Sequence, residues 1–501
     1  MRFAWPVVIT LALVAGVLTL DGSFVYDDAS ALFRNPIVVG ELPASAAFTH
    51  DYWGGPLDQP IRSYRPLMPF VWHGLWAIAP KNPLPFRLLS LLLHVAATAS
   101  VFALLLHVLS ERKAALVGAL LFAWHPVHAE AVGAIVAHSD LLSAALGCAV
   151  LISGVGTLQR AWLSAAILFV ACAAKESAVV FGAALIAAEL ARQRDLDALK
   201  RCLPIAALIA SVVALQLSFA RAPGGAIPES LALSLHGLLR IVYGFYIIGR
   251  GSWLLVLPTG LAPHHGFAAI EPTLASLGPF ASLGVLAVAA AVMLGLRALR
   301  QPDPVMLGAL VLWLAPLAIQ SGFFVNPVTD IAERLLYTPS IAGCGALGVL
   351  LTRALPHPRL QTIALSAVLL VLGALTVEAQ RAWVNDDALW SRAVVVEPRS
   401  WQSQKNYAAQ LSMQGRPTEA AWPFLVSFSL VRRYPRPVDW SVVERLEQLP
   451  LDQRIVEGPF ALEPNNGCGF ARVYLLNMRK SAPELVATLT PMYAARGCDK
   501  L

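Results

Sequence analysis

The sequence has few charged residues, and this shortage excludes most water-soluble folds. Of its 501 residues only 14% are charged, against roughly a quarter in an average soluble domain, while 57% are hydrophobic. A large soluble helical enzyme would need charged faces on its helices, and stretches such as 86–109 and 363–377 have almost none. Composition therefore predicts that much of the chain lies in a lipid bilayer.

Several chemical signatures are also missing. The patterns GxxxxGK[ST] and GxSxG do not occur, so a nucleotide-driven pump and a serine hydrolase have no support. The six cysteines show no CxxC metal-binding spacing. Cys468 and Cys498 could pair if their region faces an oxidising compartment. The net charge of +6 is spread over short clusters between apolar runs, so we expect no nucleic-acid partner.

Eleven apolar runs are predicted to cross the membrane. They cover residues of about 4–20, 85–109, 114–128, 138–156, 161–174, 176–191, 203–220, 277–298, 305–322, 336–353 and 361–377. With the N-terminus inside, this count puts every basic cluster on the cytoplasmic side, as the positive-inside rule requires. Another crossing at 236–257 would move 297–300 outside, so we interpret 236–257 as re-entrant or as lying along the interface.

The predicted fold is thus all-α, with a transmembrane module at 1–378 and an external helical domain at 379–501. The module has a long first external loop at 21–84. Within the external domain, 386–432 has features of tetratricopeptide (TPR) repeats, including Gly415 between helices and small alanines. An ordinary helical hairpin is the alternative.

Acidic and basic side chains cluster on the external side of this topology. Asp27 and Asp28 follow the first span, where dehydration favours a raised pKa that suits a general base. Arg65, in an aromatic part of the loop, could hold a phosphate through paired N–H donors. Arg334 could neutralise a departing phosphate. Glu333 and Tyr337, four residues apart, could orient it.

Two further groups lie in breaks between apolar runs. The first contains two histidines three residues apart and nearby polar residues, for which we expect substrate hydrogen bonding, with a divalent metal as second alternative. Its members are His125, His128, Glu130, His138 and Asp140. Pro126 should disrupt the helix that metal spacing would need. The second group is Lys175 and Glu176, which are adjacent on a helix and are expected to make separate contacts.

These motifs occur in a familiar order. FVYDD at 24–28, YRPL at 64–67, HPVHAEAV at 125–132 with SDLL at 139–142, AAKES at 173–177 and AERLLYTPS at 332–340 resemble the transmembrane and tetratricopeptide-repeat O-mannosyltransferase family. That family is a branch of the C-type glycosyltransferases. His138 departs from the arginine usual before the SDLL-like aspartate, and the repeat array is shorter than in animal members.

The resemblance implies an inverting transfer of a hexose, such as mannose, from a polyprenyl- or dolichyl-phosphate to a hydroxyl. The acceptor would be a protein Ser/Thr or a glycan. Asp27 or Asp28 would be the base, and we favour Asp27, with Arg334 at the donor phosphate. No cofactor is implied. We expect a bacterial inner membrane with a periplasmic site, or the ER membrane of a eukaryote. The competing hypotheses are a non-catalytic scaffold or transporter that binds a partner through its external helices, and transfer to a glycan or lipid.

Overall fold

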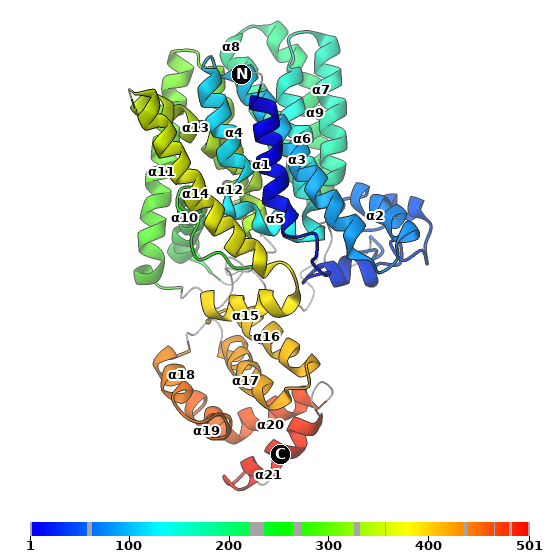
Figure 1. Ribbon diagram of the computed structural model, residues 1–501, viewed down its shortest axis with the longest axis vertical. Coiled ribbons are helices and arrows are strands. Elements are labelled where there is room, and N and C mark those ends of the chain that lie inside the picture. The colour runs from blue at the N-terminus through cyan, green and yellow to red at the C-terminus, as the bar shows by residue number, and fades with distance from the viewer. Residues whose placement is uncertain are drawn as a thin grey trace.

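The computed structural model describes residues 3–57, 63–219, 235–263, 272–324, 331–355, 357–433, 438–464, 466–479 and 483–498. Within these ranges the chain forms helices and no β-strand, as predicted. Figure 1 shows two stacked parts, with α1 to α14 in an upper bundle and α15 to α21 beneath it. The N-terminus lies at the end of the bundle that points away from the C-terminal helices.

A helix coincides with each of the eleven predicted spans. They are α1 Ala4–Val17, α3 Pro83–Val108, α4 Arg112–Ala123, α6 His138–Ser153, α7 Leu158–Ala174, α8 Val179–Arg192, α9 Leu196–Phe219, α11 Leu274–Arg300, α12 Pro304–Gln320, α13 Tyr337–Ala354 and α14 Pro358–Ala382. Residue 220, the expected end of the seventh span, lies outside the described residues.

Six helices in the described ranges are long and apolar enough to span a bilayer, or seven if one bent pair counts as a single span. The bent pair is α4 and the segment Pro126–Gly133, at 49° to each other. Pro126 therefore interrupts the helix as expected, because it lacks an N–H and its ring clashes with the preceding turn. Helices α1, α7 and α12 are apolar but shorter. The chain is an all-α polytopic membrane protein, and the count of eleven stays a prediction.

The stretch interpreted as re-entrant contains one continuous helix, α10 Gly237–Leu254, packed along α11. Glycines make this close approach possible. A Cβ on Gly249 would overlap the carbonyl oxygen of Phe280, and one on Gly284 would overlap that of Phe245. Small residues are the usual means by which membrane helices bring their backbones together. Helix α10 is not among the six long apolar helices, and whether it crosses the membrane remains a prediction.

Glycines also explain a spacing that could be mistaken for a nucleotide-binding loop. Residues 343–348, GCGALG, have the G-x-G-x-x-G spacing of dinucleotide sites, which requires a strand before it and a helix after it. Here the whole run lies inside helix α13. A Cβ on Gly348 would come within 2.5 Å of the carbonyl oxygen of Ala114 on α4. These glycines therefore serve helix packing.

Polar contacts bring predicted cytoplasmic segments together in pairs. Arg353 near the end of α13 bonds Glu111 before α4, with 3.0 Å between Nε and Oε1. Arg194, after α8, donates to the carbonyl oxygen of Leu299 near the end of α11. The side of the membrane on which these segments lie stays a prediction.

The C-terminal helices have an apolar core of their own, which runs from Trp401 to Cys498. The helices are α15 Asp386–Val396, α16 Trp401–Met413, α17 Pro417–Arg433, α18 Trp440–Glu447, α19 Leu451–Leu462, α20 Gly467–Met478 and α21 Pro483–Ala494. A disulfide joins Cys468 to Cys498, with 5.3 Å between their Cα atoms. Trp390 of α15 belongs instead to the core of the bundle, so a boundary at 378 stays a prediction.

Helices α16 and α17 form the hairpin in which the sequence suggested a repeat. Gly415 joins them with φ +73°, a left-handed conformation that glycine adopts without strain. Ala408 and Ala420 are buried together where the two helices pack. Both a tetratricopeptide repeat and an ordinary hairpin fit this arrangement, and the two alternatives remain open.

Two remaining short helices, α2 Leu67–Ile78 and α5 Ala129–Gly133, flank the predicted site. Helix α2 belongs to the stretch 21–84, predicted to be an external loop, and projects to the side of the bundle in Figure 1. Trp72 and Trp76, on one face of α2, are both buried. They therefore pack against protein.

Candidate functional site

The acidic loop, residues 18–28, directly follows α1. At its end Tyr26 has φ +56°, which a non-glycine residue rarely adopts, and its N–H donates to the Asp386 carboxylate at 2.8 Å. A π-helical turn, Ala29–Phe33, begins directly after the acidic pair. Such turns and left-handed residues occur often at functional sites.

The two adjacent aspartates have different environments. Asp28 is fully buried, and both its carboxylate oxygens accept backbone N–H groups, from Val25 and Val136, each at 3.1 Å. Asp27 is partly exposed, and its side chain makes no hydrogen bond to any residue in the described ranges. Asp28 is thus engaged in holding the loop, whereas the Asp27 carboxylate is open to a ligand.

Burial changes the acidity of both carboxyls. The pKa of Asp27 is raised above 3.8 because burial disfavours the charged form, and the positive charge of Arg334 opposes that rise. The pKa of Asp28 is raised by burial to about 7, against the charge of Arg87 and its two backbone hydrogen bonds. A raised pKa matches the requirement for a general base that works near neutral pH.

Arg87 of α3 is fully buried and joins three segments around the acidic loop. Its guanidinium donates to the carbonyl oxygens of Gly133 and Ser23, and to that of Trp383 at 3.3 Å. Arg87 therefore connects the start of the loop, α5 and the end of α14. Its charge also acts on Asp28.

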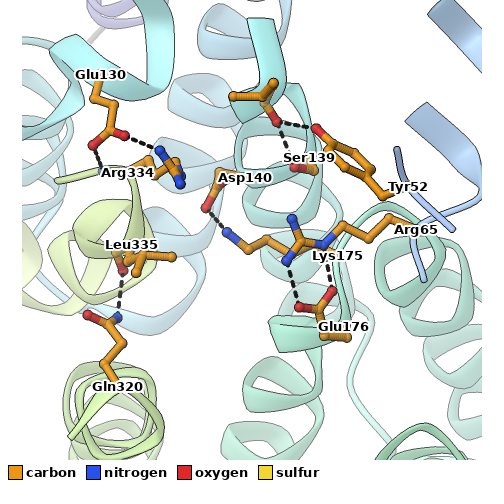
Figure 2. Close-up of polar contacts among 11 residues, drawn as sticks. Tyr52, Arg65, Glu130, Ser139, Asp140, Lys175, Glu176, Gln320, Arg334 and Leu335 are labelled. Atoms are coloured by element: carbon orange, nitrogen blue, oxygen red, sulfur yellow. Dashed lines mark hydrogen bonds and ion pairs between the residues drawn. The ribbon is translucent and has the colours of Figure 1, made fainter. Parts of the chain in front are cut away.

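Arg334 lies in a 3-10 turn, Glu333–Leu336, that leads into α13. Its guanidinium forms an ion pair with the fully buried Glu130 of α5, whose other carboxylate oxygen accepts the Arg334 backbone N–H at 2.9 Å (Figure 2). The charges of Asp27 and Asp140 also act on Arg334. Glu130 thus fixes both the backbone and the head group of an arginine whose charge also acts on Asp27.

A second pair of ionic contacts lies beside the first, as Figure 2 shows. Arg65 bonds Glu176 through both its Nε, at 2.7 Å, and its Nη2, at 2.6 Å. Lys175 forms a buried ion pair with Asp140 of α6. The expectation that Lys175 and Glu176 make separate contacts is confirmed. Arg65 also lies over the Tyr52 ring, 5.4 Å from its centroid.

The structure therefore brings most of the predicted charged residues together. Asp27 interacts electrostatically with Arg334, Arg334 with Asp140, and Lys175 with Glu176, which forms an ion pair with Arg65. A continuous row of alternating charge thus runs from the acidic loop to Arg65, just before α2. Basic side chains along one row are suited to an anionic ligand such as a phosphate.

The three predicted histidines are buried in the protein interior beside this row. His125 bonds the Leu255 carbonyl oxygen at 3.1 Å, and His128 bonds the Ser340 hydroxyl at 2.8 Å. His138 contacts Trp72 through the indole N–H at 3.1 Å. In the described ranges no group of three His, Cys, Asp or Glu side chains could hold a metal ion. These contacts of the histidines are to other residues of the chain, and their hydrogen bonding to a substrate stays a prediction.

Glu333 and Tyr337 have other partners than the suggested one. Glu333 accepts the Ala262 backbone N–H at 2.6 Å, and the Tyr337 hydroxyl bonds His94 at 2.9 Å. The hydrogen bonds that orient Arg334 come from Glu130 instead. The four-residue spacing of Glu333 and Tyr337 gave no indication that Glu130 orients Arg334, because Glu130 is distant from Arg334 in sequence.

Sequence reasoning missed Arg87, Tyr52 and Asp386. Arg87 had a signal, because a lone arginine inside an apolar run is expensive and usually functional or paired. Tyr52 is buried and its hydroxyl donates to the Val136 carbonyl oxygen at 2.8 Å, next to the N–H that Asp28 accepts. Asp386 had no clear signal, because an acid in the first turn of a helix is common.

Comparison with known proteins identifies similar chains. No family model matches the sequence. Protein O-mannosyl-transferase F38B6.6 of Caenorhabditis elegans is 23% identical over 420 residues, and TMTC1 of Homo sapiens is 26% identical over 492 residues. Each alignment covers 83% of this chain. The chain's relatives are protein O-mannosyl-transferases.

The family resemblance seen in the motifs is thereby confirmed. A shorter match, to Protein O-mannosyl-transferase Tmtc2 of Drosophila melanogaster, reaches 38% identity over 135 residues, or 26% of this chain. The alignments span 61% of the nematode protein and 54% of the human one, so the chain matches little more than half the length of these relatives.

Proposed function

We propose that this chain is a membrane glycosyltransferase that moves a hexose, such as mannose, from a polyprenyl- or dolichyl-phosphate carrier to a protein Ser or Thr hydroxyl. The observation that carries the proposal is an Asp27 carboxylate that is partly exposed and not hydrogen-bonded to any described residue, and that interacts electrostatically with an Arg334 held in place by Glu130. The names of the relatives support glycosyl transfer to protein.

In the proposed reaction the Asp27 carboxylate removes the proton of the acceptor hydroxyl. The acceptor oxygen then forms a bond to the anomeric carbon as the bond from that carbon to the lipid phosphate oxygen breaks. The electron pair of the broken bond stays on the phosphate. Arg334 stabilises this additional negative charge, and the N–H donors of Arg65 and Lys175 lie further along the same row. A single displacement of this kind inverts the anomeric centre.

The disulfide supports an external position for the C-terminal helices. Cys468 and Cys498 are paired, and disulfides persist in oxidising compartments such as the periplasm or the ER lumen. Since α15 contacts the acidic loop, the same side of the membrane would hold the active site. This agrees with the side that the basic clusters predict for it.

Radiolabelled transfer tests the proposal. Purified wild type, Asp27→Asn and Asp21→Asn would be given undecaprenyl- or dolichyl-phosphate [3H]mannose with Ser/Thr peptides. Removal of a general base should reduce the rate by roughly 10²–10⁴-fold in Asp27→Asn. Asp21 is an exposed acid near the start of the same loop, so Asp21→Asn should transfer at the wild-type rate.

The outcomes separate the competing functions. Equal transfer by wild type and Asp27→Asn would refute the proposed base. No transfer by folded wild type from either lipid donor would favour the scaffold or transporter hypothesis. Label found only on added glycan or lipid would retain the enzyme and replace its acceptor.

A further inference from the structure

The first C-terminal helix, α15, touches the acidic loop at several points. The Ser23 N–H donates to the Val384 carbonyl oxygen at 2.8 Å, just before α15 begins. The Tyr26 N–H donates to the Asp386 carboxylate at 2.8 Å. The Tyr26 ring packs edge-to-face on Trp390, with 5.1 Å between the centroids. The residue before Asp27 is thus held by α15 through its backbone and its ring.

Tyr26 needs such support because of its backbone conformation. At φ +56° a residue with a Cβ is strained, and the conformation persists only where the surroundings impose it. Asp386 supplies the acceptor that the Tyr26 N–H needs, and Trp390 is itself buried. Both supports come from successive turns of one helix.

The direction of the Asp27 carboxylate depends on this conformation. Asp28, the next residue, is fixed by two backbone hydrogen bonds, whereas no described residue hydrogen-bonds the Asp27 side chain. The backbone on either side of Asp27 therefore sets where its carboxylate points. A change at Tyr26 would turn that carboxylate relative to Arg334.

We infer that α15 is a positioning element of the proposed active site, in which Asp386 and Trp390 hold Tyr26 left-handed and thereby aim Asp27 at the acceptor. The inference rests on the proposed function. It also gives the C-terminal helices a role in the rate of reaction, because α15 packs on α16 as well as on the acidic loop.

The chain offers a matched control for Asp386. Asp387 lies in the same first turn of α15, so it contributes the same charge to the helix N-terminus. Its carboxylate accepts from Gln414 of the α16–α17 connection at 2.7 Å. Replacing either residue by alanine removes one acid from the start of α15, but only Asp386→Ala loses the hydrogen bonds to the Tyr26 N–H and to the Trp390 side chain.

The experiment measures kcat and the KM for dolichyl- or undecaprenyl-phosphate mannose in Asp386→Ala, Asp386→Asn and Asp387→Ala, with melting temperature as a second readout. A small misplacement of a reacting group costs roughly up to 10²-fold in rate, so kcat of Asp386→Ala should fall about 10- to 100-fold with a nearly unchanged donor KM. Asp386→Asn should recover most of kcat, since its amide oxygen accepts the same N–H. Asp387→Ala should keep the wild-type kcat.

A role in stability alone would give a different result. In that case both alanine variants would melt at lower temperature while each folded molecule kept the wild-type kcat, and the inference would be overturned. If Asp386→Ala yields no folded protein, the kcat values of Trp390→Leu and Trp390→Phe are compared instead. Loss of the ring in Trp390→Leu should lower kcat, whereas the phenylalanine ring of Trp390→Phe should preserve it. Equal kcat in these two variants and wild type would also overturn it.

Asp27→Asn in the same assay separates this inference from the proposed function. If Asp27→Asn is inactive while Asp386→Ala has the wild-type kcat, only the positioning role of α15 is refuted. If Asp27→Asn is as active as wild type, the proposed base is refuted before α15 is considered.

Discussion

Replacing Arg87 by lysine tests whether this buried residue holds the acidic loop against the bundle. The guanidinium donates to three carbonyl oxygens, those of Ser23, Gly133 and Trp383, which belong to segments far apart in sequence. A lysine ammonium keeps the charge but is a compact group on a flexible stem, which lacks the fork that spans several acceptors. We expect it to reach one of the three carbonyls and to leave the other two.

The expected loss follows from those two hydrogen bonds. A hydrogen bond to a charged group contributes about 1.5–3 kcal/mol, so Arg87→Lys should lower the free energy of unfolding by about 3–6 kcal/mol. The positive charge stays buried in the variant, so no relief of desolvation offsets the loss. The rate of sugar transfer should also fall, because Arg87 holds Ser23, which lies a few residues before Asp27 in the acidic loop.

Thermal unfolding with a thiol-reactive dye suits this chain. Four free cysteines are all buried, so the dye should react only when the bundle unfolds. Arg353→Lys is the control, because Arg353 is exposed and pairs with Glu111, a contact worth about 0–1 kcal/mol. An Arg87→Lys protein with the melting temperature of the wild type would refute the idea that Arg87 holds the acidic loop against the bundle.

Three further perturbations have defined outcomes. Because burial raises the pKa of Asp27 above 3.8, its carboxylate form is lost as the pH falls through that raised pKa, and kcat/KM should decline with it. A pH profile of kcat/KM whose decline on the acid side lies at or below pH 3.8 would contradict this prediction. Removing the disulfide with Cys468→Ser should destabilise the C-terminal core by about 3–4 kcal/mol, because the bond closes a loop of 30 residues between Cys468 and Cys498. A urea unfolding curve identical to that of wild type would contradict this prediction. Asp140→Ala leaves Lys175 as an unpaired buried charge and should lower the free energy of unfolding by about 3–5 kcal/mol. Adding Lys175→Met should recover most of this loss. An Asp140→Ala variant as stable as wild type would contradict a stabilising role of the ion pair.

The helices could be predicted from the sequence because apolar runs mark them directly. Each predicted span has a helix, and the interruption at Pro126 follows from the chemistry of proline. Periodicity has no information on how two helices cross, so the continuous α10 and its glycine contacts with α11 were not foreseen. An apolar window also hid Arg87, since one charge hardly changes the average of 86–109.

The members of the site could be predicted from their chemistry, but their partners could not. Charged residues next to apolar runs are costly and therefore stand out, which found Asp27, Arg65 and Arg334. The partner of Arg65, Glu176, lies 111 residues away, and that of Arg334, Glu130, lies 204 residues away. Only tertiary structure sets such pairings. The same holds for the difference between the adjacent aspartates, which depends on an N–H 108 residues from Asp28.

The most direct measurement follows the sugar and the lipid together. Folded wild-type protein would be incubated with a Ser/Thr peptide and a doubly labelled polyprenyl-phosphate mannose, with GDP-mannose alone in a parallel reaction. The account predicts mannose on the peptide hydroxyl in inverted configuration, one free polyprenyl phosphate for each sugar transferred, and no product from GDP-mannose. Transfer from GDP-mannose without a lipid carrier, or equal transfer by Asp27→Asn, would contradict it.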